Sequence, residues 1–370
     1  MENKICIYAI CKNEEQFVDK WYESMKEADY IVVLDTGSTD GTLEKLKAHK
    51  DIIVEQKVIT PWRFDVARNE SLKLVPADAN ILFCTDLDET LDPGWSKPLR
   101  EKWIEGQHER GFYKYIWSHD INGNPGRIFH YDKIHSRHWH WYAPVHEMLT
   151  ADEPYASRYN SHAIDLFDDI TLQHYPDNTK SRSSYLPLLE LRAEENPTDY
   201  YGLYYLSHEY YYQGYYEKSI SLLNDLYYNH NQEFNQLEQA AMFLFMGDNY
   251  KALNDLEKAL FCYNKAIHID KTYREPYLAA AEIYNTLEFY NLAIGYTQEA
   301  FKNSFRHFSW IERDNSWKEQ PYDILSISYY YINELDKALE NVNIALNFND
   351  KDSRILLNKE FILRKKEGAN

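Results

Sequence analysis

The first half of the chain alternates between short apolar runs and amphipathic segments. Apolar runs rich in β-branched residues predict strands, and apolar positions three and four residues apart predict helices. The expected order is strand 4–11, helix 12–28, strand 30–35, helix 43–50, strand 51–59, helix 65–75 and strand 80–86. This alternation predicts a largely parallel sheet with helices on both faces, whose ligands bind beyond the carboxyl ends of the strands.

From about residue 183 the apolar pattern has a helical period throughout. Four segments align so that one position is occupied by Ser219, Ala259, Ala293 and Ala338, and the position seven residues later by Leu226, Ala266, Ala300 and Ala345. Small residues on one helix face allow close packing, and the step from 259 to 293 equals the 34-residue period of a tetratricopeptide repeat. We predict about four such repeats in an all-α domain, 183–370, after an α/β domain, 1–182.

Composition narrows the class of protein. A chain of 370 residues is long enough for two domains, and its formal charge of −19 argues against nucleic-acid binding or a basic membrane-bound surface. The four cysteines show no CxxC spacing, which fits a reducing compartment. The first apolar run is too short for a signal peptide, and no run could span a bilayer. We therefore expect a cytoplasmic protein without a transmembrane segment.

The stretch "ILFCTDLDETLDP" places two aspartates, Asp86 and Asp88, directly after a predicted buried strand. Two chemistries use such a pair. Asp86 could be the nucleophile of a phosphatase with Asp88 as its acid/base, or the pair could hold a divalent metal against a sugar-nucleotide diphosphate.

The phosphatase alternative is a resemblance to haloacid-dehalogenase-like enzymes. "DLDETL" is close to their Asp-x-Asp-x-Thr signature, and "FDDIT" (167–171) would supply a later acidic pair. That signature normally ends the first strand of the domain, whereas here about eighty residues precede it. The residue after the second aspartate is usually glycine, and here it is Glu89.

Four segments in order, "CIYAICKNEEQFVDKWYESM", "IVVLDTGSTDGT", "RFDVARNESL" and "ILFCTDLDETLDPGW", resemble family 2 glycosyltransferases of the GT-A fold over about residues 4–180. "VHEML" and "LQHYPD", leading into helical repeats, look like the bacterial subgroup with C-terminal tetratricopeptide repeats. Some members of that subgroup glycosylate Cys or Ser of ribosomal peptides. The resemblance implies a Rossmann-like GT-A domain.

By this resemblance, Asp88 is a direct ligand of Mn²⁺ or Mg²⁺ and Asp86 contacts the ribose or a metal-bound water. Such ions accept a few carboxylates and fill their other positions with phosphate oxygens and water. His174 is a further candidate ligand, although a single histidine before a proline turn is more often structural.

The resemblance also gives Asp35 to the nucleobase and Arg68 to the diphosphate, with Asn13 at the neighbouring strand end. The alternatives are local. The segment "DTGSTDGT" could be only a turn that caps the next helix, and Arg68 could form a surface ion pair with Asp65 or Glu70.

An inverting transfer needs a base to deprotonate the acceptor. Glu147 is the candidate and His146 its rival; an acceptor thiol would reduce the demand on either. The segment around them holds five histidines at spacings that match no ordered zinc motif. Trp139, Trp141 and Tyr142 could form a platform for a sugar ring, or a half-buried strand pairing.

The segment 199–218 is crowded with tyrosines, which fill a helix-pair interface or line a groove for a peptide or glycan. Taken together, the sequence predicts a metal-dependent inverting glycosyltransferase. We expect a UDP-sugar donor, a peptide, protein or glycan acceptor, and a homodimer through the repeats. A repeat scaffold with an inactive nucleotide-binding domain is the remaining alternative.

Overall fold

The computed structural model describes residues 3–158, 161–177 and 183–368. They form two compact units, one of Met1–Asn196 with Phe308–Trp310 and one of Pro197–His307 with Ile311–Asn370. Helix α5 (Tyr185–Glu195) belongs to the first unit. The predicted boundary between residues 182 and 183 adjoins the segment 178–182, which lies outside the described residues, and it stays a prediction.

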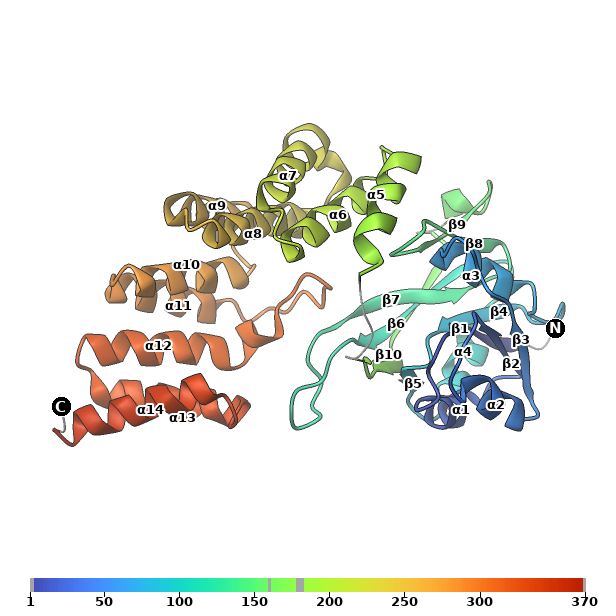
Figure 1. Ribbon diagram of the computed structural model, residues 1–370, viewed down its shortest axis with the longest axis horizontal. Coiled ribbons are helices and arrows are strands. Elements are labelled where there is room, and N and C mark those ends of the chain that lie inside the picture. Colours follow the sequence, from blue (N-terminus) through green and yellow to red (C-terminus); the bar gives the residue numbers. More distant parts are fainter. Residues whose placement is uncertain (1–2, 159–160, 178–182, 369–370) are drawn as a thin grey trace. The chain divides into compact units, whose positions relative to one another are not determined.

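The first unit begins with the predicted alternation of strands and helices. Its elements are β1 (Ile5–Cys11), α1 (Val18–Met25), β2 (Tyr30–Asp35), α2 (Thr42–Ala48), β3 (Ile52–Gln56), α3 (Phe64–Leu72) and β4 (Ile81–Thr85). The four strands pair in parallel in the order β3-β2-β1-β4. Figure 1 shows them side by side in the N-terminal unit. The α/β class with a mostly parallel sheet is confirmed.

Beyond β4 the same sheet continues with mixed strand directions. Its further strands are β7 (Ile128–His135), β6 (Arg110–Ile116), β10 (Ala163–His174) and β5 (Glu89–Leu91), in that spatial order. The pairs β4–β7, β7–β6 and β10–β5 are antiparallel, and the pair β6–β10 is parallel. Three elements lie outside this sheet, α4 (Ser96–Lys102), the hairpin of β8 (Trp139–Tyr142) and β9 (Met148–Ala151), and the 3₁₀ turn Ala156–Arg158.

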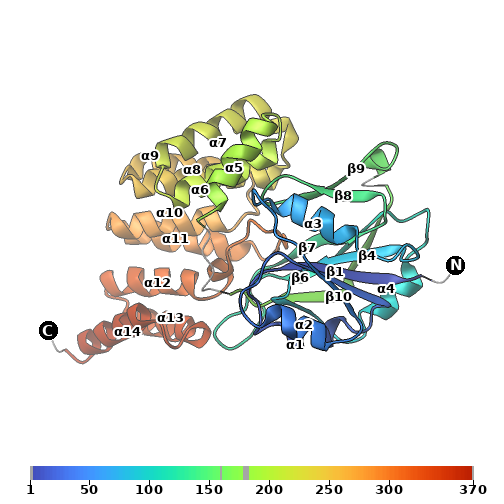
Figure 2. The ribbon, with the colours of Figure 1, turned by 45° about the vertical axis from the view of Figure 1, so that its right-hand side comes forward.

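Apolar side chains cover both faces of the sheet. On one face Trp21 of α1 and Leu46 of α2 are buried against alternate residues of the central strands. On the other, Ala67 of α3 packs near Ile10, and Trp141 of β8 packs near Tyr8. Figure 2 shows α3 on the face opposite α1 and α2. The helices therefore shield both faces, as the pattern predicts.

The predicted aromatic platform of Trp139, Trp141 and Tyr142 is wrong for the two tryptophans, whereas Tyr142 is half-buried. Trp139 and Trp141 are each only 4% exposed, so their ring faces are not available to a sugar. The alternative of a half-buried strand pairing is correct, because both residues lie in β8, which pairs with β9.

The first helix begins later than predicted, at Val18 and not at residue 12. Asn13 has a positive φ of 55°, which a continuing helix does not allow. Its backbone nitrogen donates to Ser38 Oγ at 2.8 Å, and its side-chain oxygen accepts from the backbone nitrogen of Thr39 at 2.8 Å. The residues after β1 therefore form a loop that is tied to the loop after β2.

A buried chain of hydrogen bonds connects β8 with the central strands. Trp141 Nε1 donates to the Tyr8 hydroxyl at 2.8 Å, and that hydroxyl lies 2.6 Å from His135 Nε2. The other ring nitrogen of His135 lies 2.7 Å from the carbonyl oxygen of Ser136, so it donates and Nε2 accepts. Burial lowers the pKa of His135 to about 3.

We predict that His135 makes the protein less stable as the pH falls below about 6.5. The unfolded chain binds a proton there while the native imidazole stays neutral, so unfolding becomes easier by up to about 1.4 kcal/mol per pH unit. Urea unfolding of the wild type and of His135→Gln at pH 7 and pH 5 measures this. The stability difference between them should shrink by about 2 kcal/mol. Parallel pH profiles would contradict the prediction.

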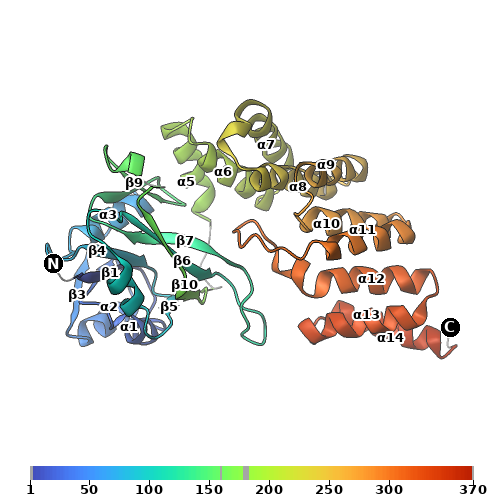
Figure 3. The same cartoon turned by 180° about the vertical axis from the view of Figure 1, so that it is seen from behind.

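The second unit consists of helices, joined by short 3₁₀ turns at Asn231–Glu233 and Asp314–Trp317. The helices are α6 (Tyr200–Tyr212), α7 (Tyr216–His230), α8 (Gln236–Ala252), α9 (Leu256–Ile269), α10 (Glu275–Thr286), α11 (Tyr290–Lys302), α12 (Glu319–Tyr331), α13 (Leu335–Phe348) and α14 (Ser353–Lys366). Consecutive helices pack as four pairs, α6 with α7 through α12 with α13, and α14 packs on α13. Figure 3 shows the later pairs in successive layers. The tetratricopeptide-like architecture is confirmed.

The aligned small residues lie where the pattern predicts. All eight positions of the alignment, which belong to the second helix of each pair, are fully buried. The tyrosines of the segment 199–218 divide into two groups: Tyr204 is fully buried, whereas Tyr212 and Tyr215 are 69% and 48% exposed. Packing therefore explains only part of the tyrosine-rich segment, and a tyrosine-lined groove stays a prediction.

Two glycines inside helices give a matched test of this packing. A Cβ at Gly247 of α8 would lie 2.3 Å from Cε1 of Tyr263, whereas a Cβ at Gly295 of α11 would have no neighbour within 4 Å. We expect Gly247→Ala to destabilise the protein by about 1–3 kcal/mol, because the ring must move. Gly295→Ala should stabilise it by up to about 1 kcal/mol. Chemical denaturation measures both, and equal effects would contradict this account.

Candidate functional site

The predicted site residues follow three neighbouring parallel strands. Asp35 ends β2 beside Cys11, the last residue of β1, and Asp86 follows β4. Because β2, β1 and β4 are adjacent and parallel, their carboxyl ends meet at one edge of the sheet. The topology therefore brings these segments together, as the sequence predicts.

Asp35 is fully buried and accepts three hydrogen bonds on Oδ1. The donors are the backbone nitrogens of Gly37 and Ser38, both at 2.9 Å, and Gln56 Nε2 at 2.8 Å. Burial raises the pKa of Asp35, but hydrogen bonds from Ser38, Gln56 and Gly37 outweigh it, so the pKa lies below its ordinary value. Asp35 therefore both shapes the turn after β2 and supplies a fixed carboxylate at the sheet edge.

In the Asp-Leu-Asp turn (86–88), the leucine points into the apolar core and the two carboxylates do not. Leu87 is 1% exposed and packs in the main core cluster, whereas the side chains of Asp86 and Asp88 are 31% and 17% exposed. The alternation around one buried leucine turns both carboxylates away from the interior.

Asp88 lies next to His174, with 3.4 Å between Oδ2 and Nε2. The pairing of β5 with β10 explains the contact, because it places His174 opposite Glu89. His174 Nδ1 lies 3.0 Å from the carbonyl oxygen of Trp117, so Nε2 is the nitrogen directed at Asp88. Burial lowers the pKa of His174, but Asp88, the Trp117 carbonyl and Glu89 together outweigh it, so the pKa lies above its ordinary value.

Asp86 is held by Arg68, which is only 4% exposed. Arg68 Nη2 donates to the two oxygens of Asp86 at 2.9 and 3.3 Å, and its Nε donates to Glu147. The expectation of a surface ion pair with Asp65 or Glu70 is wrong. Arg68 is buried, and its partners come from the turn after β4 and from the segment after β8.

Two further buried residues complete this cluster and were not singled out in the sequence. Lys133 of β7 places Nζ 2.9 Å from Asp86 Oδ2 and 3.6 Å from Glu89 Oε1. Glu89 also accepts from the backbone nitrogen of Asp86 and from the Tyr115 hydroxyl, at 2.9 and 2.8 Å. Burial raises the pKa of Glu89, and Lys133 opposes that shift. The sequence of β7, IFHYDKIH, gives no clear signal for Lys133, because Asp132 and two histidines stand in the same strand.

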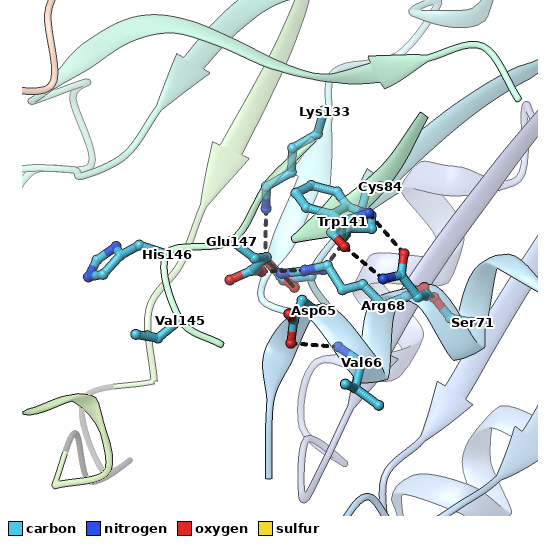
Figure 4. A network of polar contacts seen from close by, with 12 residues as sticks. Asp65, Val66, Arg68, Ser71, Cys84, Lys133, Trp141, Val145, His146 and Glu147 are labelled. Carbon is cyan, nitrogen blue, oxygen red and sulfur yellow. Dashed lines mark hydrogen bonds and ion pairs between the residues drawn. The ribbon is translucent and has the colours of Figure 1, made fainter. Parts of the chain in front are cut away.

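The two candidate bases point in different directions. Glu147 points at Arg68, whereas the His146 side chain points away from both (Figure 4). His146 has a positive φ of 47°, which turns the chain between the two residues, and its ring lies edge-on to Tyr185 at 5.7 Å. Glu147 is therefore the one that belongs to the charged cluster.

A pocket of about 230 Å³ lies beside Asp88. Its lining combines Gln16, Phe17, Lys20 and Trp21 with Leu87, Asp88, Thr90 and Tyr175. The ammonium of Lys20 sits 3.4 Å from the ring centre of Tyr175. The pocket thus joins aromatic surface to amide, hydroxyl and charged groups, a combination suited to a polar ring with apolar faces.

The fit of this edge to a divalent metal can be assessed from its ligands. Among the described residues, no three His, Cys, Asp or Glu side chains gather closely enough to form a protein-only cage. Asp88 and His174 nevertheless form a carboxylate–imidazole pair whose second ring nitrogen is bound to a backbone carbonyl, an arrangement that orients metal-binding histidines. A metal that takes its other ligands from phosphate and water fits such a pair.

Comparison with known proteins shows what the N-terminal part of the chain is similar to. Residues 6–144 match the family model Glycosyl transferase family 2. Over those residues the N-terminal domain is similar to family 2 glycosyltransferases. A curated relative, the lipopolysaccharide core biosynthesis glycosyltransferase LpsC of Rhizobium meliloti (strain 1021), is 35% identical over 95 residues. That match covers 25% of this chain and 33% of LpsC, so the chain spans about a third of that relative's length.

Solved structures similar to this chain include a tetratricopeptide protein. TTC0263, described as a thermophilic TPR protein in Thermus thermophilus, is 19% identical and matches 49% of this chain and 90% of its own at a TM-score of 0.38. The APC/C hetero-tetramer Cut9-Hcn1 is 14% identical, and the match covers 50% of this chain and 33% of that chain at a TM-score of 0.42. In the described part of the chain, no helix is long and apolar enough to cross a membrane.

We predict that Arg68 contributes strongly to stability through its two buried partners. Arg68→Met leaves Asp86 and Glu147 without that guanidinium, and should destabilise the fold by about 3–5 kcal/mol. The control is Lys73→Met, which removes an exposed pair with Glu70 and should change stability by less than about 0.5 kcal/mol. Urea unfolding measures both variants. A loss below about 1 kcal/mol for Arg68→Met would contradict the buried network.

Proposed function

We propose that this protein is a metal-dependent, inverting glycosyltransferase that moves a sugar from a UDP-sugar to a peptide, protein or glycan acceptor. The observation that carries the proposal is one edge of the parallel sheet in the domain that matches family 2. There Asp35 ends β2, Asn13 follows β1, and Asp86 and Asp88 follow β4. A site at that edge suits a nucleotide-sugar, because base, ribose and diphosphate can lie across successive strand ends.

In this proposal each residue of the edge has its own task. Asp35 accepts a hydrogen bond from the nucleobase, with Asn13 organising the adjoining loop, and Asp86 meets the ribose or an ordered water. Arg68 acts near the diphosphate by fixing Asp86. Asp88 and His174 would hold Mn²⁺ or Mg²⁺, which supplies positive charge for the leaving diphosphate when bound.

Glu147 is our proposed base, with His146 as its rival. The buried Arg68 guanidinium holds the Glu147 carboxylate in place, and an acceptor hydroxyl or thiol would give its proton to that carboxylate. The helical repeats are proposed to hold the acceptor and to form a homodimer. We propose a cytoplasmic location.

The decisive experiment is a thermal-shift panel of UDP, GDP, CDP and their sugars, each with and without Mn²⁺. A nucleotide at a hundred times its dissociation constant stabilises a fold by about 2.7 kcal/mol. We expect a shift with UDP or a UDP-sugar that requires Mn²⁺. Asp88→Ala should abolish the shift, whereas Asp78→Ala, which removes a distant exposed partner of Lys4, should keep it.

Other outcomes would favour the alternatives. The absence of a shift with every nucleotide would contradict the transferase proposal. A beryllofluoride adduct on Asp86 would support the phosphatase. Partner binding that survives Asp88→Ala, without turnover of any sugar donor, would support the scaffold.

A further inference from the structure

A buried ammonium group lies directly beside the Asp-Leu-Asp turn. Lys133 is 5% exposed, and its place is fixed by backbone pairing, since β7 pairs with β4 through His135 opposite Leu82 and Ile134 opposite Phe83. Taking a lysine out of water is costly, and an apolar side chain of similar size is often as good for stability. A buried lysine at this position therefore calls for a reason other than folding.

The immediate partner of Lys133 is Asp86, which is thereby matched with two cations. Oδ1 of Asp86 accepts a hydrogen bond from Arg68 Nη2 at 2.9 Å. Oδ2 accepts from Lys133 Nζ at 2.9 Å and from Arg68 Nη2 at 3.3 Å. Figure 4 shows Lys133 and Arg68 pointing toward one place from different elements. Both oxygens of Asp86 accept hydrogen bonds from cationic side chains, whereas Asp88 lies 3.4 Å from the imidazole of His174.

The two aspartates of the turn therefore stand in opposite electrostatic surroundings. A carboxylate already neutralised by two fixed cations has little attraction left for a divalent metal. It also presents little negative charge to an incoming diphosphate. A carboxylate beside an imidazole keeps its capacity as a metal ligand.

We propose that Lys133 is a positioning residue that, together with Arg68, keeps Asp86 as a neutralised carboxylate that does not bind the metal. Asp88 alone of the pair then serves the metal, and the diphosphate of the donor approaches a turn whose net charge Lys133 has reduced. This inference rests on the proposed function. It adds Lys133 as a residue that favours binding of the anionic diphosphate.

The consequence is an opposite effect of Lys133 on cation and anion. Removing the ammonium adds one uncompensated negative charge at the turn. Mn²⁺ alone should then bind with unchanged or higher affinity, while the nucleotide diphosphate should bind more weakly. A purely structural lysine would not separate these two affinities.

The test is calorimetric titration of the full chain with Mn²⁺ alone and with UDP in saturating Mn²⁺. For Lys133→Met we expect UDP affinity to fall at least tenfold and Mn²⁺ affinity to be unchanged or higher. Lys133→Arg keeps the charge and should stay within threefold of the wild type for both. The control is Lys102→Met on α4, which removes an exposed ammonium paired with Asp169 of β10 at 2.5 Å, and it should change neither affinity.

Lys133→Met with the affinities of Lys102→Met would overturn the inference and leave the proposed function intact. A wild type that binds no nucleotide would overturn the proposed function itself. If Lys133→Met does not fold, the double variant Lys133→Met with Asp86→Asn decides. The double variant should regain stability, because it removes the charge that Lys133 neutralises. A double variant no more stable than Lys133→Met would overturn the inference.

Discussion

The candidate site of this molecule depends on the burial of one guanidinium between two carboxylates. Arg68 can be buried because it forms ion pairs with Asp86 and Glu147, which lie in separate parts of the chain. A buried charge without a partner would cost several kcal/mol, so the ion pairs fix α3, the end of β4 and the segment after β8 relative to one another. The hydrogen bonds between Asn69 and the backbone of Trp141, at 2.7 and 2.8 Å, reinforce the same joint.

The paired charges also give each carboxylate of the site a different character. Asp35 accepts from neutral amide donors, Asp86 accepts from two cations, and Asp88 lies 3.4 Å from an imidazole. Burial raises the pKa of Glu89, a residue that sits among them. An aspartate can therefore serve the proposed nucleobase recognition, form buried ion pairs or bind the proposed metal. Its surroundings decide which of these roles it takes.

The sequence predicts the elements whose signal is local. The strands β1, β2 and β4, their parallel order, and the positions of Asp35 and Asp86 at strand ends follow from periodicity and the strand-end rule. The buried small residues of the helix pairs follow from the recurrence at Ala259 and Ala293. Motif resemblance added the family, which the comparisons confirm for residues 6–144.

Contacts that depend on the antiparallel half of the sheet could not be predicted in this way. Nothing near Lys133 in the sequence indicates that β7 will pair with β4, and the partners of Arg68 differ from the neighbours that spacing suggested. The start of α1 was misplaced for a similar reason. Asn13 adopts a positive φ because its hydrogen bonds go to Ser38 and Thr39, which are distant in sequence.

The pairing of β5 with β10 has a consequence for the order in which the site is assembled during synthesis. Arg68 and Asp86 are near in sequence and can meet while the first half of the domain is emerging. Asp88 can meet His174 only after the chain has extended through β10, since contacts of large sequence separation require the closure of a long loop. A nascent chain that stops before β10 would thus lack the carboxylate–imidazole pair, so the residues of the proposed metal site come together only after β10 has been synthesised.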